Sequence, residues 1–296
     1  MPVDSSRWTA NLDHLQINSP DPEALAGWYR DTMGMAPHRL SADLYLVEAP
    51  QRRLLIGRGA AGEHPFNAWT LAQAGQLHAL REHVGRAGLA VEDTPSPLFK
   101  PDAFAVRDPD GRLAVFGLAA RDRVPDGVPM PAGSGKVAAM PARLQHAVVA
   151  TTRLEAMHTF YVERLGFALS DTVYTHEDGE PLGAPHVYFF RSDHEHHSLA
   201  AFTGSTSRYD HHCYETTCWN DIRDWLDHLG QLGVAPWWGP GRHGPGNNLF
   251  FMIRDLDGNA LELSAEIEIM SAADPPRTWS NSRRTYNLWG VSWLRD

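Results

Sequence analysis

The chain has 296 residues, of which 43% are hydrophobic, and its formal net charge is −10 at pH 7. The length suggests about two domains, and the acidic balance argues against a nucleic-acid partner, because phosphate binding needs a basic footprint. No apolar run of about 18 residues indicates a membrane span. The first residues lack the basic and apolar regions of an export signal. Cys213 and Cys218 are the only cysteines, so we expect a reduced, cytoplasmic protein.

Two segments of the chain repeat one another. Residues 12–35 align without a gap with residues 144–167, at an offset of 132 that places His14 on His146. Downstream, two shorter segments match as well, residues 83–89 with 228–234 and residues 108–111 with 255–258. A repeat of this length is a duplicated supersecondary unit rather than a bias of composition.

Each copy reads in chain order as a strand, a helix and several further strands. In the first copy, Asp21 is a plausible N-cap and Pro22 the first residue of a helix that runs to about Met33. The elements expected there are strand 12–18, helix 22–33, strands 44–48, 53–57 and 65–71, helix 74–88, and strands 103–107 and 112–118. The second copy repeats this order, with strand 144–150, helix 153–165, strands 167–175, 186–191, 198–203 and 211–218, helix 219–233, and strands 248–254 and 259–265. We therefore expect an α+β fold.

Two segments lie outside the repeat. Residues 121–142 are rich in Pro, Gly and Ala, which marks a linker between a first domain, 1–120, and a second domain, 143–296. The tail from about residue 267 carries Trp279, Trp289 and Trp293, and we expect it to pack on the core as a docking segment.

The second copy carries a candidate metal site that the first copy lacks. Two histidines and one carboxylate on one face of an octahedron suit Fe(II) or Mn(II) and leave positions open for substrate and O2. His146, His212 and Glu262 are the candidates, and Glu262 is notable because a carboxylate in an apolar strand needs a partner. Counting back along the matched segments, the first copy offers His14, Asn67 and Val115 instead, a set that cannot hold iron.

The sequence does not decide which of two adjacent histidines faces the interior. A single histidine on a strand is most often a hydrogen-bonded core or surface residue. His211 and His212 are adjacent, and strand alternation indicates that one of them faces the interior without deciding which.

These motifs resemble one known family. They are Leu-Gln-His146, His196-His197-Ser followed by His211-His212, Gly-Arg-His243-Gly, and Asp-Gly-Asn-Ala-Leu-Glu262. In this pattern the chain is similar to the two-domain type I extradiol ring-cleaving dioxygenases of the vicinal oxygen chelate (glyoxalase/bleomycin resistance) superfamily, the group that includes catechol 2,3-dioxygenases. The resemblance implies two tandem domains, each made of paired βαβββ modules that form an open barrel around a cavity. It also implies Fe(II), with Mn(II) as the alternative metal, bound by His146, His212 and Glu262.

The resemblance further assigns roles around the metal. His197 corresponds to the acid–base residue beside bound O2, a role that suits the near-neutral pKa of histidine. His243 corresponds to a histidine that contacts the substrate oxygens, and Trp238 is a further candidate for substrate contact. The family places a tyrosine ten residues before the ligand glutamate, whereas this chain has Met252 there. We therefore expect Met252 to line a more apolar substrate pocket.

The expected function is an Fe(II)-dependent extradiol dioxygenase that cleaves a catechol-type ring beside its diol with O2, in the catabolism of aromatic compounds. The implied partners are a small aromatic diol and O2, without membrane or nucleic acid, in a homo-oligomer. Two alternatives remain. One is a superfamily enzyme that acts on a non-catechol enediol or a hydroquinone. The other is a metal-free binding protein for aromatic ligands.

Overall fold

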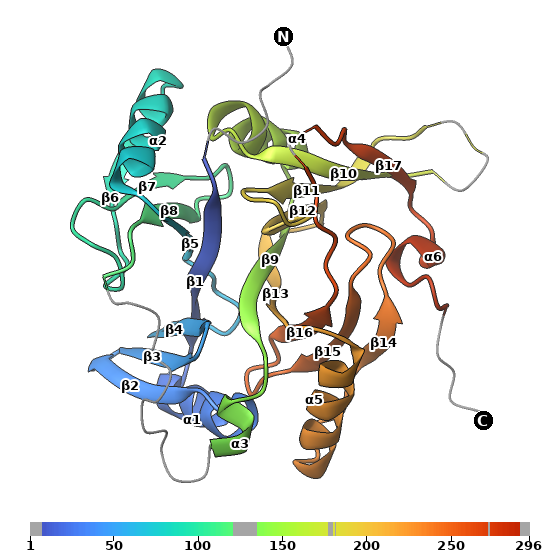
Figure 1. Cartoon of the computed structure of the whole chain (residues 1–296). Helices are drawn as coiled ribbons and strands as arrows, with labels where there is room; N and C mark the ends of the chain where they lie inside the picture. Colours follow the sequence, from blue (N-terminus) through green and yellow to red (C-terminus); the bar gives the residue numbers. More distant parts are fainter. Residues whose placement is uncertain (1–7, 121–134, 177–179, 181, 272, 291–296) are drawn as a thin grey trace.

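The computed structural model describes residues 8–120, 135–176, 180, 182–271 and 273–290. Its strands form two mixed sheets, one from each copy of the repeat (Figure 1). The first strands of the two copies, β1 (Ala10–Ser19) and β9 (Arg143–Thr151), lie side by side at the centre of the molecule, as Figure 1 shows. No helix among the described residues is long and apolar enough to cross a membrane.

The first sheet has eight strands in the order β2-β3-β4-β1-β5-β8-β7-β6. β1 pairs in parallel with β4 and antiparallel with β5, and β5 pairs in parallel with β8. The bounds of its other strands are β2 Ala36–Ser41, β3 Leu44–Ala49, β4 Arg52–Arg58, β5 Phe66–Leu71, β6 Val91–Asp93, β7 Phe104–Arg107 and β8 Leu113–Gly117.

The second sheet has nine strands in the order β14-β15-β16-β13-β9-β12-β11-β10-β17. The arrangement of the first sheet recurs here, because β9 pairs in parallel with β12 and antiparallel with β13, and β13 pairs in parallel with β16. The bounds of its other strands are β10 Ala168–Tyr174, β11 Pro185–Arg191, β12 Leu199–Thr203, β13 Arg208–Glu215, β14 Trp238–Arg242, β15 Leu249–Arg254, β16 Ala260–Ala265 and β17 Arg277–Ser280.

The helices lie on the outside of the sheets (Figure 1). The first begins as predicted, with the Asp21 side chain accepting from Ala24 N and Pro22 in the first turn, and it ends at Gly34 with φ of 64°. Instead of one helix over 153–165, a short α-helix continues into a π-helix. The bounds are α1 Pro22–Met33, α2 Ala74–Arg86, α3 Gly135–Ala138, α4 Leu154–His158, η1 Thr159–Arg164, α5 Trp219–Gln231 and α6 Arg283–Tyr286.

Two equivalent tyrosine–aspartate contacts join the two copies. The Tyr29 hydroxyl of the first copy donates to Asp255 Oδ2 of the second, at 3.4 Å. The residue that matches Tyr29 is Tyr161, and it interacts with Asp108, which matches Asp255. One hydrophobic core draws on both copies. The predicted fold class is confirmed as two tandem α+β modules, whereas the exact domain boundaries stay a prediction and part of the predicted linker lies outside the described residues.

The interior of the first barrel is filled with side chains. A second, smaller apolar cluster occupies it, made of Leu46, Leu55, Phe66, Ala68, Leu98, Phe99, Ala103, Ala105 and Val115. Apolar side chains therefore occupy this part of the first module.

Candidate metal centre

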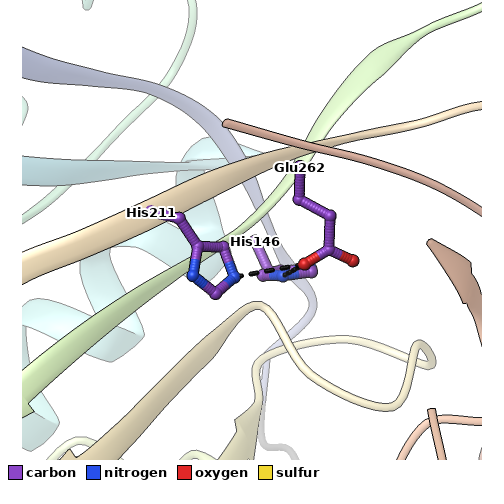
Figure 2. Close-up of side chains that lie close together, drawn as sticks. All are labelled: His146, His211 and Glu262. Carbon is purple, nitrogen blue, oxygen red and sulfur yellow. Dashed lines mark ion pairs between the residues drawn. The ribbon is translucent and has the colours of Figure 1, made fainter. Parts of the chain in front are cut away.

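Three buried side chains converge inside the second barrel (Figure 2). His146 stands on β9, His211 on β13 and Glu262 on β16, and their exposed fractions are 2%, 7% and 1%. Their ligand atoms all lie within 4.8 Å of one another. Glu262 Oε2 lies 3.7 Å from His146 Nε2 and 3.2 Å from His211 Nε2. These distances leave room for one ion between the three groups.

Strand register explains why these three meet. β13 lies between β9 and β16, and Cys213 is directly opposite both His146 and Glu262. Side chains of directly paired residues share a face of the sheet, and so do residues two apart on one strand. His211, two residues before Cys213, therefore faces the same side as His146 and Glu262.

The expectation that His212 would be the second ligand is wrong. His212 points to the opposite face of β13, into the contact between the two modules. There its Nδ1 bonds with the Tyr209 hydroxyl, and its ring stacks on Tyr29 of the first module with centroids 6.3 Å apart. The physical reason is the alternation of side chains along a strand, which gives two adjacent histidines opposite faces.

The same register shows what the first module has at these positions. Ala68 of β5 pairs with both His14 and Val115. Cys213 of β13 pairs in the same way with His146 and Glu262. Ala68 is therefore the equivalent of Cys213. The residue two before Ala68 is Phe66, so the set is His14, Phe66 and Val115. Asn67, which the sequence comparison matched with His212, indeed shares its position and points to the interface, where its Oδ1 contacts His64.

The two histidines are held with Nε2 free for an ion. Nδ1 of His146 donates to Gln145 Oε1, and Nδ1 of His211 donates to Asp210 Oδ2 at 2.8 Å. Metal-binding histidines commonly use their second nitrogen in this way, which fixes the tautomer and the orientation of the ring. Glu262 is oriented in turn by Asn248, whose Nδ2 donates to its Oε1 at 3.2 Å.

The ionisation of the side chains in the centre favours the binding of a cation. Burial alone would raise the pKa of Glu262, but its contacts with His146 and His211 outweigh burial and lower that pKa. Burial likewise opposes protonation of His211, but Asp210 and Glu262 raise its pKa to about 9. The carboxylate of Glu262 is therefore ionised and attracts positive charge, as the donors of a divalent metal site do.

His197 and His243 flank this centre. The ring centroids of His197 and His146 lie 4.3 Å apart. Burial lowers the pKa of His197 well below 6.5, so His197 is neutral. Its Nδ1 contacts His196 Nδ1 at 2.9 Å. Nε2 of His243 lies 3.9 Å from Glu262 Oε1, and its ring stacks on Phe250 with centroids 3.7 Å apart.

A cavity of about 350 Å³ opens beside the three ligands. Trp238 and Met252 line it as predicted, and Met252 pairs directly with Glu262 in the register of β15 and β16. The lining residues are His146, Val148, His186, Val187, Phe189, His197, Ala200, Phe202, Asp210, His211, Trp238, His243, Pro245, Asn248, Met252, Glu262, Asn281, Thr285 and Tyr286.

Sequence reasoning missed several of these residues. The C-terminal segment does pack on the core, where Trp279 Nε1 donates to Asp171 at 2.7 Å, but it also lines the cavity through Asn281, Thr285 and Tyr286. Trp293 lies outside the described residues. Asp210 and Gln145 each sit next to a ligand histidine in sequence, a signal that could have suggested their supporting role.

The part of the chain that carries the centre is similar to one known family. Residues 143–263, which span all three ligand candidates, match the glyoxalase/bleomycin resistance protein/dioxygenase superfamily. The match covers the part of the chain that holds the candidate site. The vicinal oxygen chelate fold expected from the sequence is therefore confirmed for the module that holds the site.

Two named relatives match 64% or more of the chain. Metapyrocatechase 2 of Cupriavidus necator is 25% identical over 88% of this chain and 82% of its own length. The iron-dependent extradiol dioxygenase of Rhodococcus jostii (strain RHA1) is 28% identical over 64% of this chain and 66% of its own length.

Solved structures share the fold along nearly the full length. Homoprotocatechuate 2,3-dioxygenase from Arthrobacter globiformis superposes with a TM-score of 0.78 and 19% identity, covering 99% of this chain and 91% of that one. The Mn(II)-bound glyoxalase from Novosphingobium aromaticivorans superposes with a TM-score of 0.74 and 22% identity, covering 96% and 91%.

Proposed function

We propose that this protein is an Fe(II)-dependent extradiol dioxygenase that cleaves a catechol-type ring with O2. The observation that carries the proposal is the buried set of His146, His211 and Glu262, which opens on a cavity that also holds His197 and His243. The named relatives support the same reaction class. Mn(II) is the alternative metal, because the donor set suits both ions.

His146, His211 and Glu262 would hold the metal at the wall of the cavity. Bound Fe(II) would supply the Lewis acidity that binds a diol and the redox chemistry that passes electrons from the ring to O2. His146 and His211 each present Nε2, because Gln145 and Asp210 occupy their Nδ1 atoms.

The cavity residues would handle the substrate's protons and orientation. Neutral His197 can accept a proton from the diol, and the 4.3 Å separation of its ring from that of His146 places it beside the metal. His243 is held by stacking on Phe250 and by its Nδ1 contact with the Tyr286 carbonyl at 2.6 Å, so its Nε2 is directed at the centre. Phe189, Phe202 and Trp238 form walls that exclude water from the reacting ring.

Oxygen uptake with reconstituted protein tests this function. We expect purified protein, loaded anaerobically with Fe(II), to consume O2 in proportion to the catechol supplied and to give a ring-opened product. Uptake with hydroquinones or enediols only would favour the alternative superfamily chemistry, for which Met252 in place of a tyrosine is the supporting observation. Binding of aromatic diols without any metal would support the other alternative, a metal-free binding protein.

Assembly and location belong to the proposal as well. We propose a cytoplasmic homo-oligomer. The family resemblance implies the assembly, and the two cysteines, Cys213 and Cys218, which are both free, fit a reducing compartment. Light scattering of the purified protein checks the assembly.

A further inference from the structure

The cavity beside the metal centre has walls of a definite chemical character. Away from the three ligands, its sides are built mainly from aromatic and aliphatic side chains. These are Val148, Val187, Phe189, Ala200, Phe202, Trp238, Pro245 and Met252. Burying each CH2 group of a ligand against such walls contributes about 0.8 kcal/mol.

None of the described residues that line the cavity is an arginine or a lysine. The carboxylates among them are those of Asp210 and Glu262, and both are engaged with His211, the histidine of the candidate metal centre. His186 also lines the cavity, and burial lowers its pKa, so it adds no positive charge at neutral pH. A carboxylate on the substrate would therefore lose its water and find no cationic partner.

The arginines that belong to neighbouring segments are paired with carboxylates or exposed. Arg277 is held by two carboxylates, Asp171 at 2.8 Å and Glu268 at 2.6 Å. Arg208 donates to Asp210 Oδ1 at 2.8 Å and its side chain is 53% exposed. On the C-terminal segment, Arg283 and Arg284 are exposed while their neighbours Asn281, Thr285 and Tyr286 line the cavity.

The size of the cavity limits the substrate as well. A volume of about 350 Å³ is near the lower end of the range of small-molecule pockets, about 300–1,000 Å³. This favours one ring with a compact substituent over a fused or extended aromatic system.

We propose that the cavity selects an uncharged, single-ring vicinal diol that carries an apolar substituent, and that it rejects diols carrying a carboxylate. The inference rests on the proposed function and narrows its substrate class. It departs from what fold similarity alone suggests, since several of the superposed structures are homoprotocatechuate enzymes, one of them in complex with 3,4-dihydroxyphenylacetate. The walls described above lack a partner for that acid group.

A matched substrate pair tests the inference. 4-Propylcatechol and 3,4-dihydroxyphenylacetate have side chains of similar size, one apolar and one ending in a carboxylate. We expect kcat/KM, and equilibrium binding to the metal-loaded protein without O2, to favour the propyl compound by at least about 100-fold. A ratio near one, or a preference for the acid, overturns the inference while leaving ring cleavage itself intact.

Two variants at one position give the reciprocal test. His186→Lys places a cation on the cavity wall, whereas His186→Leu at the same position does not. We expect the lysine variant to reduce the preference for the propyl compound by about 10-fold or more, and the leucine variant to keep or increase it. Equal behaviour of the two variants would contradict the charge argument.

The test also separates this inference from the proposed function. Absence of cleavage with every diol, together with selective binding of the apolar ones, contradicts the proposed function and supports the inference. If Arg283→Ala or Arg284→Ala abolishes binding of the acid, those side chains reach the cavity and the inference fails.

Discussion

The adjacent histidines of β13 allow a sharp test of the metal centre. We predict that His211→Phe removes the metal and that His212→Phe keeps it. The substitution is the same at two neighbouring buried positions, so general effects of a larger apolar ring are shared. The first module already carries phenylalanine, Phe66, at the position equivalent to His211, which indicates that the fold accepts that ring there.

The expected magnitudes follow from what each side chain contacts. Loss of a group that merely orients a ligand histidine costs about 10–100-fold in metal affinity, so loss of the ligand His211 should raise Kd by more than about 100-fold. His212→Phe leaves the buried Tyr209 hydroxyl without its partner, which costs about 1–3 kcal/mol. That corresponds to a drop in Tm of about 2–12 °C in a protein of this size class.

Metal analysis after anaerobic reconstitution and dialysis, with thermal unfolding of the metal-free proteins, measures both effects. Wild type and His212→Phe should each retain one metal per chain, and His211→Phe should retain close to none. Retention by His211→Phe, or loss by a folded His212→Phe, would refute the assignment of the ligands from strand register.

Four further predictions concern the surroundings of the centre. His197→Phe should keep the metal and lose about 10²–10⁴ in turnover if His197 is the acid–base group; unchanged turnover would assign it a packing role. Gln145→Leu should weaken metal binding by about 10–100-fold because His146 loses its Nδ1 partner, with metal titration of the apoprotein as the measurement and unchanged affinity as the contrary result. Burial raises the pKa of Glu215 to about 7 from 4.5, so the folded state holds a proton that the unfolded state releases, and stability is lost as pH rises between these values. Glu215→Gln should therefore reduce the loss of unfolding free energy between pH 5 and pH 8 by up to about 3 kcal/mol, as denaturant titrations would show; an equal loss in both proteins would contradict the shift. Met252→Tyr restores a phenol opposite Glu262 and should change kcat/KM among substituted catechols more than it changes iron affinity; the reasoning fails if neither selectivity nor rate moves.

The sequence alone was enough to place the candidate metal site in the second half of the chain. The repeat aligned His14 with His146 and identified Val115 at the position of Glu262, and the sheet register confirms both pairings. This worked because a duplicated module conserves order and spacing, so a missing ligand in one copy is visible as a difference between two matched residues.

Local structure was predictable where a side chain itself directs the backbone. Asp21 and Pro22 begin α1 as expected. Short edge strands carried no such signal. β14 reads as Trp-Gly-Pro-Gly-Arg, a composition typical of turns, and β17 pairs only with β10, which is distant in sequence. The π-helix η1 follows a pattern that is ordinarily helical, so nothing in the sequence distinguished it.

Only the tertiary structure decided which histidine of the pair His211 and His212 faces the metal centre. A strand places alternate side chains on opposite faces, and the face that looks into the barrel depends on how β13 pairs with β9 and β16. Those pairing partners lie more than 45 residues away along the chain. The alternation is a local property that the sequence carries, whereas the register that orients it is a property of the assembled sheet.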